Sequence, residues 1–370
     1  MSTPISQFSY NLPKEQIAQH SVEPRDSSRL MILDRTTGEI EHKHFYDILD
    51  ELHTGDVLVF NDTKVFRARM KGERAERAEK AEMVEMEIFL LRCVPPPLIE
   101  GRVGVGCVWQ ALLRPGKKVQ VGDVIMIDDL EIAVREKHED GVALLEFPLD
   151  EAGVLAFTDT HGSIPIPPYV SEVPDDANKY QTVYAREVGS VAAPTAGFHF
   201  TRELLEKIKA KGVELAFVTL HVGIGTFRPV QSETIEEHTM HAEFVTISKE
   251  TSEQINRAKQ EGRRVIAVGT TTVRSLEGAA MSSSPSPFEG EGRGEVLPSN
   301  GFVGDVNMFI KPGFEFKVID ALITNFHLPK STLLVLVSAL AGREHVLHAY
   351  EEAVREQYRF FSFGDAMFVH

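Results

Sequence analysis

This chain of 370 residues has few cysteines, no long apolar run and no excess of positive charge. Its two cysteines, Cys93 and Cys107, exclude a disulfide framework and a cysteine-rich zinc site. No run of about 18 apolar residues, the length that spans a bilayer, occurs, and residues 1–16 form no signal-peptide core. We therefore expect a cytoplasmic protein with reduced thiols and no membrane partner.

Basic residues are outnumbered, with 39 Lys and Arg against 55 Asp and Glu and a formal net charge of −16. The net negative charge of the protein repels nucleic acid at long range, because contacts to phosphates need Lys and Arg that face the ligand. Any such partner requires a local patch. Candidate basic residues cluster in the first part of the sequence: Arg25, Arg29, Lys64, Arg67, Arg69 and Lys71.

The order of apolar segments predicts an α/β fold with an insertion. Strands are expected at 30–33 and 56–62, with a helix at 44–52 between them. Residues 65–148 change to short alternating segments separated by turns, typical of a small antiparallel barrel. The strands expected there are 109–113, 118–121, 124–127, 132–134 and 143–147.

Helix and strand signals alternate again after Pro148. Thr201, Ser248 and Ser331 are expected to cap helices, and strands are expected at 215–220, 265–268 and 318–323. The sequence therefore predicts a main mixed α/β domain (1–64 and 151–370) interrupted by a small antiparallel β-barrel domain (65–150). Segment 73–82 is predicted as a solvated helix or a mobile loop, 94–106 as an extended excursion from the barrel, and 282–299 as a flexible insertion. The sequence has no exposed heptad pattern, so we expect a monomer.

Three histidine-bearing segments, 194–201, 220–229 and 324–332, each begin where an apolar run stops. Enzymes with α/β folds place substrate-binding groups at such strand ends. One histidine in apolar surroundings is usually structural, but His199, His221 and His327 share this placement. An ordinary histidine pKa of about 6.5 suits proton transfer at neutral pH. We predict that these segments assemble one active site.

Two glycine and threonine segments suggest ligand contacts. Thr270, Thr271 and Thr272 follow a strand and Gly269, so their backbone N–H groups at a helix start can hold a carboxylate or phosphate, although an ordinary capped helix is as good a reading. Gly223 and Gly225 allow close backbone approach, yet the third glycine of a dinucleotide fingerprint is missing. The sequence also lacks a nucleophile elbow and a phosphate-binding loop.

His238, His241 and Glu243 have a composition that can bind a divalent metal. Their spacing differs from the helical His-Glu-x-x-His pattern, and residues 244–247 are a predicted strand. A polar pocket in which Glu243 fixes one imidazole is the favoured interpretation, so no metal is expected. A metal-dependent hydrolase remains the alternative enzyme class.

Longer motifs carry a resemblance to a known family. With the histidine segments, the motifs at 10–13 (YNLP), 23–30 (EPRDSSRL), 60–65 (FNDTKV), 267–274 (AVGTTTVR) and 358–367 (YRFFSFGDAM) resemble the S-adenosylmethionine:tRNA ribosyltransferase-isomerases of queuosine biosynthesis. The resemblance implies an α/β domain interrupted by a β-barrel. It also implies transfer and isomerisation of the ribosyl group of S-adenosylmethionine onto 7-aminomethyl-7-deazaguanine in the tRNA anticodon. The product would be epoxyqueuosine-tRNA, with release of adenine and methionine and no permanently bound cofactor.

That reaction needs a base for an acidified C5′ hydrogen, an acid for the departing adenine and a polar surround. We hypothesise that His199 and His221 are the base and acid, with His327 as a further candidate. Carboxylates that would orient imidazoles or offset the sulfonium charge are Asp62, Glu243 and Asp320. Candidate contacts to S-adenosylmethionine are Gly223, Gly225, Thr226, Arg228, Thr270, Thr271 and Thr272. Candidate tRNA contacts are Arg25, Arg29, Asn61, Asp62, Lys64, Arg67 and Arg69. A binding protein without catalysis, using the barrel as its RNA platform, is the third possibility.

Overall fold

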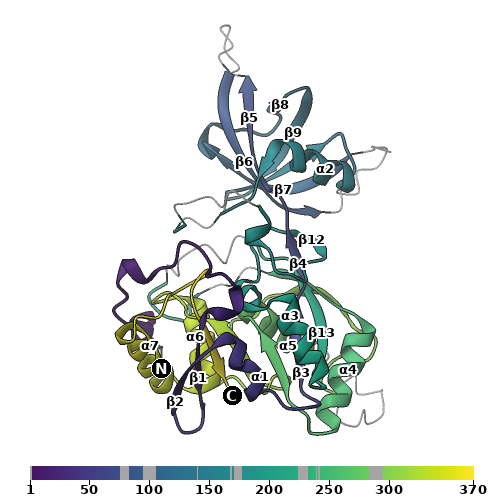
Figure 1. The fold of residues 1–370 in the computed structure, drawn as a ribbon. Coiled ribbons are helices and arrows are strands. Elements are labelled where there is room, and N and C mark those ends of the chain that lie inside the picture. Colours follow the sequence, from purple (N-terminus) through teal and green to yellow (C-terminus); the bar gives the residue numbers. More distant parts are fainter. Residues whose placement is uncertain are drawn as a thin grey trace. The chain divides into compact units, whose positions relative to one another are not determined.

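The computed structural model describes residues 2–75, 83–94, 106–139, 141–166, 169–170, 177–223, 232–238, 240, 242–282 and 295–370. It divides into two compact units (Figure 1). One, here called the α/β unit, comprises Met1–Thr63, Pro168–Glu187 and Ala193–His370. The other, the barrel unit, comprises Lys64–Pro167 and Val188–Ala192. The predicted fold class, a mixed α/β domain interrupted by an antiparallel barrel, is confirmed.

A nine-stranded mixed sheet forms the centre of the α/β unit, in the order β16-β14-β13-β3-β15-β17-β18-β1-β2. The strands are β1 Arg29–Leu33, β2 Ile40–His44, β3 Val57–Asn61, β13 Glu214–Leu220, β14 Glu243–Ile247, β15 Val265–Val268, β16 Phe302–Val306, β17 Ala321–Asn325 and β18 Ala366–Val369. The neighbours β13, β3, β15 and β17 run parallel to one another. Their carboxyl ends therefore lie along one edge of the sheet.

Six α-helices accompany this sheet among the described residues: α1 Ile48–Glu51, α3 Arg202–Ala210, α4 Lys249–Gln260, α5 Thr270–Ser282, α6 Thr332–Ala341 and α7 Arg343–Arg355. The predicted caps are confirmed. The hydroxyl oxygens of Thr201, Ser248 and Ser331 accept the backbone N–H three residues on, at 3.1, 3.1 and 3.2 Å. No helix in the described part of the chain has the length and apolar character to cross a membrane.

Alternation along the strands places the core of the α/β unit. Leu58 and Phe60 of β3 join Leu204 and Ile208 of α3 in one buried cluster. Phe60 also meets Phe200 edge-to-face, with ring centroids 5.0 Å apart. Figure 1 shows α3, α4 and α5 beside β3 and β13. Every residue of β3 is buried, so both faces of this strand are covered, which explains its almost uninterrupted apolar sequence.

Short 3-10 turns complete the α/β unit: η1 Ile5–Phe8, η2 Lys14–Gln16, η3 Arg25–Ser27, η4 Phe45–Asp47, η6 Ala177–Tyr180 and η7 Thr195–His199. The helix predicted at 44–52 is instead η4 followed by the single turn α1. The strand β2 before it was not predicted, because its sequence IEHKH is largely polar and lies at the sheet edge.

Six strands close the barrel unit: β5 Arg69–Ala75, β6 Met83–Val94, β7 Cys107–Arg114, β8 Val124–Ile127, β9 Leu130–Lys137 and β10 Val142–Phe147. They follow the order β5-β6-β7-β10-β9-β8, and a β5–β8 pairing completes the ring. Smaller elements are β4 Thr63–Val65, β12 Glu187–Ser190, β11 Gly162–Ser163, η5 Gly116–Lys118 and α2 Glu151–His161. Buried Ile88, Trp109, Ile125 and Phe147 belong to its apolar core.

Two expectations in the barrel are wrong. Residues 118–121 form no strand, since η5 and a turn occupy this segment and Asp123 Oδ2 accepts the Gln120 N–H at 2.8 Å. Glu73–Ala75, predicted as loop or solvated helix, continue β5 and pair with β6. The rest of the 73–82 segment and residues 95–105 of the next predicted excursion lie outside the described residues.

The strand predicted at 318–323 is also displaced, because β17 begins at Ala321. The carboxylate of Glu277 on α5 accepts the backbone N–H groups of Lys317, Val318 and Ile319 at 2.9, 3.0 and 3.1 Å. The backbone N–H groups of residues 317–319 therefore donate to a side chain of α5 and not to a neighbouring strand.

The predicted flexible insertion 282–299 has a packed end. Leu297 is buried, and Asn256 bonds its N–H and carbonyl at 2.9 Å each. Residues 283–294 lie outside the described residues.

Candidate active site

The edge formed by the carboxyl ends of β13, β3, β15 and β17 gathers four of the sequence motifs. Asn61 ends β3 and is followed by Asp62 and Thr63, and His221 follows β13. Gly269–Thr272 follow β15, and Asn325 ends β17 and is followed by Phe326 and His327. The strand β3 has β13 on one side and β15 on the other. In open α/β sheets, ligands bind at such a point, beyond the carboxyl ends of the strands. We call this region the strand-end site.

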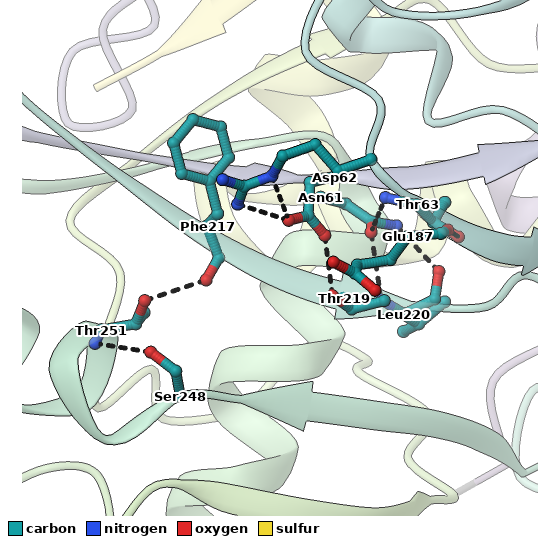
Figure 2. A network of polar contacts seen from close by, with 10 residues as sticks. Asn61, Asp62, Thr63, Glu187, Phe217, Thr219, Leu220, Ser248 and Thr251 are labelled. Atoms are coloured by element: carbon teal, nitrogen blue, oxygen red, sulfur yellow. Dashed lines mark hydrogen bonds and ion pairs between the residues drawn. The ribbon is translucent and has the colours of Figure 1, made fainter.

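Asn61 joins three elements at this edge and is fully buried. Its amide donates to the Leu220 carbonyl and accepts from the Leu220 N–H, both at 3.0 Å (Figure 2). A longer contact of 3.4 Å reaches Thr271 Oγ1 at the start of α5. Asn61 is predicted to contact tRNA, but the hydrogen bonds of its side chain connect β3, β13 and α5.

Asp62 is buried beside Asn61 and binds side chains from two directions. Its Oδ1 accepts from Thr219 Oγ1 at 2.7 Å, as Figure 2 shows, and its Oδ2 accepts from Nη2 and Nε of Arg186 at 2.7 and 3.2 Å. The Arg186 guanidinium lies over the Phe217 ring, 4.6 Å from its centroid. Asp62 thus orients a half-exposed arginine, which sequence reasoning missed because Arg186 lies outside the recognised motifs.

His221 lies at this edge with one ring nitrogen bonded to Thr63. Its Nδ1 lies 2.7 Å from Thr63 Oγ1, and that hydroxyl has a long contact of 3.5 Å to the Glu187 carbonyl. The short contact ties Nδ1 to Thr63 with either atom as the donor, because both the hydroxyl and the imidazole can donate or accept. Burial lowers the pKa of His221, and the nearby Asp62 offsets part of that shift.

His199 is buried, and both of its ring nitrogens bind side chains. Nδ1 lies 2.7 Å from Ser28 Oγ, and Nε2 accepts from Asn325 Nδ2 at 3.0 Å. Thr195 Oγ1 donates to Asn325 Oδ1 at 3.2 Å, which fixes the orientation of that amide. Burial, with smaller effects from Arg359 and Arg25, lowers the pKa of His199 to about 3. His199 is therefore neutral at pH 7.

His327 is equally buried at the end of β17, where Nε2 lies 3.0 Å from Thr324 Oγ1. Its backbone is held between two tyrosines, because its N–H donates to Tyr350 Oη at 3.1 Å and its carbonyl accepts from Tyr10 Oη. Burial lowers the pKa of His327 to about 3. The preceding residue, Phe326, is fully buried, and its ring packs edge-to-face against Tyr350.

Glu243, the first residue of β14, forms a buried ion pair with Nη1 of Arg274 on α5. Both side chains are less than a tenth exposed. Of the two imidazoles, one of which Glu243 was expected to hold, His241 lies outside the described residues, and His238 packs edge-on against Phe309 with centroids 5.3 Å apart. Within the described ranges, no three His, Cys, Asp or Glu side chains are grouped to hold a metal ion.

The predicted ligand-binding threonines open α5 directly after β15. Gly269 has a φ of +88°, a conformation that favours glycine, and the Thr272 hydroxyl donates to the Val268 carbonyl at 2.7 Å. The first N–H to bond within the helix is that of Val273, to Gly269 at 3.3 Å. The amides of Thr270–Thr272 thus precede the helical ladder. Gly225, Thr226 and Arg228 lie outside the described residues, and Gly223 is the last described residue of its segment.

Asp320 does not join this site. It precedes β17, at the opposite edge of the parallel strands, where it accepts from Lys259 Nζ and from the Val265 N–H at 2.8 Å each. The displaced start of β17 explains the difference, because the predicted strand 318–323 would have placed Asp320 inside the sheet.

The predicted basic residues separate into two groups. Arg25 donates to the carbonyls of Gln181 and Lys179 at 2.8 Å each, and Arg29 lies 3.7 Å from the ring centroid of Tyr358. These two guanidinium groups serve the packing of the α/β unit. The exposed basic side chains of the segment that runs from β4 into β5 form the second group: Lys64, Arg67 and Arg69.

Comparisons with known proteins agree on one family. The profile of the queuosine biosynthesis proteins matches residues 5–369. The crystal structure of an S-adenosylmethionine tRNA ribosyltransferase from Thermotoga maritima is 39% identical, with a TM-score of 0.54, covering 99% of this chain and all of that one. The motifs that meet at the strand ends lie within both matches, and the chain belongs to the family of queuosine biosynthesis proteins.

Proposed function

We propose that this chain is an S-adenosylmethionine:tRNA ribosyltransferase-isomerase. It transfers and isomerises the ribosyl group of S-adenosylmethionine onto 7-aminomethyl-7-deazaguanine in a tRNA anticodon, giving epoxyqueuosine-tRNA, adenine and methionine. The observation that carries this proposal is the family match over nearly the whole chain, supported by a 39% identical enzyme structure. The polar residues gathered at the strand-end site support the proposal.

His221 is the proposed proton-transfer residue. The sulfonium of S-adenosylmethionine acidifies the C5′ hydrogens, so a neutral base within reach can remove one of them. The contact from Thr63 leaves Nε2 of His221 available, and its lowered pKa keeps the ring neutral at pH 7. Once protonated, the same imidazolium can return its proton to a leaving or developing anionic group.

His199 takes a positioning role in this proposal instead of the acid–base role expected from sequence. Both of its ring nitrogens already bind Ser28 and Asn325, so proton transfer would break a buried hydrogen bond. His327 is assigned the same role at the next strand end, since its backbone is held by Tyr10 and Tyr350. These two neutral histidines support the strand ends against which substrate is placed.

Thr270–Thr272 are the proposed contacts to S-adenosylmethionine among the described residues. Their amides precede the α5 ladder and lie beside Asn61, at the positive end of the helix dipole. Glu243, expected from the sequence to offset the sulfonium charge, is instead proposed to hold the Arg274 guanidinium with which it pairs.

Lys64, Arg67 and Arg69 are the proposed contacts to the tRNA backbone. They are exposed on the barrel unit, and they supply a local basic patch on a chain of net charge −16. An anticodon base must leave its stack before it can react. Contacts of this kind to the phosphate backbone would hold the tRNA in register while the base leaves the stack.

The test is to incubate the protein with S-adenosylmethionine and a tRNA transcript that carries 7-aminomethyl-7-deazaguanine. Free adenine and the mass of the modified nucleoside are then followed together, with unmodified tRNA as the control. The proposal expects adenine release coupled to the added ribosyl-derived mass only with the modified transcript. Folded protein that gives neither signal contradicts it.

A further inference from the structure

Arg274 carries a feature that the roles above leave unexplained. Its side chain is more than nine-tenths buried on α5, and its Nη1 pairs with Glu243. Across the described part of the chain, Nε and Nη2 of Arg274 have no hydrogen-bond partner, although both atoms are shielded from solvent. Buried donors of a charged group almost always have hydrogen-bond partners, so we expect a ligand to accept from this edge of the guanidinium.

Two other arginines of the same chain show what such an edge binds. Arg264 grips Asp56 with Nε on one carboxylate oxygen, at 3.0 Å, and Nη2 on the other, at 2.5 Å. Arg186 also uses Nε and Nη2 to hold Asp62. The Nε–Nη2 edge is the planar fork that matches a carboxylate. In Arg274 the fork is unpartnered while the remaining nitrogen is fixed by Glu243.

The position of Arg274 places this fork toward the strand-end site. The residue lies one turn after Thr270, and side chains of a helix lean toward its amino end. Its partner Glu243 begins β14, whose neighbour β13 ends at Leu220, directly before His221. Helix α5 and β14 thus bring the guanidinium to the edge where Asn61, Thr271 and His221 meet.

We infer that Arg274 binds the α-carboxylate of the methionine part of S-adenosylmethionine through Nε and Nη2. The inference rests on the proposed function and adds a specificity residue to it. Glu243 holds the guanidinium in place, and the carboxylate completes its hydrogen bonds. The sulfonium and ribosyl carbons would then extend from this anchor toward His221.

The experiment compares S-adenosylmethionine with decarboxylated S-adenosylmethionine, which lacks only that carboxylate. Binding of each ligand is measured by calorimetry to the full chain and to Arg274→Lys, which keeps a positive charge beside Glu243 but has no fork. The wild-type protein should prefer the carboxylated ligand on the order of 10- to 100-fold, as expected for hydrogen bonds between charged groups. The Arg274→Lys variant should reduce this preference to within about threefold.

Arg264→Lys is the matched control, because it weakens an arginine–carboxylate fork at the amino ends of β3 and β15. It should leave the ligand preference unchanged. If Arg274→Lys weakens both ligands equally and keeps their ratio, Arg274 is only structural and the inference is overturned.

A measurement without variants covers the case in which Arg274→Lys does not fold. At equal concentrations, S-adenosylmethionine should raise the thermal midpoint of the wild-type protein clearly more than the decarboxylated ligand does. Equal increases overturn the inference even while adenine release continues. A wild-type protein that binds neither ligand and releases no adenine contradicts the proposed function itself.

Discussion

The two units of this chain bury different kinds of side chain. The α/β unit encloses polar residues at its strand ends, among them Asn61, Asp62, His199, Arg274 and His327. In the described part of the barrel unit, the buried polar residues are confined to Arg74, Asp123, Thr158 and Ser190 within an apolar core. Burying polar groups is costly unless each one finds a partner, so their concentration marks the region under functional constraint.

Exposed charge shows the reverse distribution along one barrel segment. Lys64, Arg67 and Arg69 point outward while Val65, Ala68 and Met70 are buried. The Arg69 guanidinium lies 5.6 Å from the ring centroid of Phe89, and the exposed positive charge of the three residues is available to a phosphate backbone. We therefore propose that the strand-end site carries the chemistry and that the barrel surface contacts RNA. Four predictions test this division.

The largest effect is expected from His221→Gln. Loss of a general acid or base costs roughly a hundredfold or more in turnover, so single-turnover adenine release should fall by at least that factor. His138→Gln, an exposed histidine of the barrel unit, is the matched control and should leave the rate unchanged. An undiminished rate in His221→Gln would remove this residue from the mechanism.

Two buried aspartates compare the units directly. Asp62 binds Arg186 and Thr219, and Asp123 binds Arg74 at 3.5 Å and the Gln120 N–H at 2.8 Å. Asp62→Asn and Asp123→Asn should each lower the free energy of unfolding by about 1–3 kcal/mol, because each weakens a buried bond to a charged group. Of the two, Asp62→Asn alone should also slow adenine release. Equal activity losses, measured at a temperature where both variants are folded, would contradict the division.

Acid should destabilise the α/β unit through its buried histidines. The folded pKa of His199 is about 3, below the ordinary value of 6.5, so the unfolded state takes up the proton first as pH falls. Stability is therefore complete above about pH 6.5 and is lost progressively from there to about pH 3.

The variant His199→Gln should reduce the slope of the unfolding free energy against pH, measured by urea unfolding, by the equivalent of up to one proton. His327 should account for a remaining slope of the same sign. A variant whose slope equals that of the wild type would show that His199 is not buried in neutral form.

The smallest effect is expected on tRNA affinity. Neutralising Lys64, Arg67 and Arg69 together should weaken tRNA binding and reduce its salt dependence by a slope of roughly 0.7–0.9 per lost phosphate contact. Affinity for S-adenosylmethionine should be unchanged. Lys71→Gln is the control, since Lys71 already pairs with Glu85 at 2.9 Å. An unaltered salt slope in the triple variant would move the RNA surface elsewhere.

Much of the fold follows from local sequence. The strand at 265–268 and the barrel strand at 124–127 were predicted with the bounds that the structure has, and the helix caps at Thr201, Ser248 and Ser331 were read from residue type alone. These elements depend on alternation and capping, which a short window of sequence contains.

The site required information from distant residues. The three histidines were recognised, but their different environments come from Thr63, Ser28 and Asn325, and no spacing rule links these to their partners. Arg186 and the paired Arg274 likewise became visible only when the sheet brought Asp62 and Glu243 to them. The same holds for Asp320, whose position changed because Glu277 holds the preceding backbone.

Hydrogen–deuterium exchange of the full chain, with and without saturating S-adenosylmethionine, tests the central claim most directly. The account predicts added protection in peptides that contain residues 61–63, 221–223 and 269–274, and unchanged exchange in β6, β7 and β10 of the barrel unit. Protection confined to the barrel strands, with the strand-end peptides unaffected, would contradict the claim that the carboxyl ends of β3, β13 and β15 form the active site.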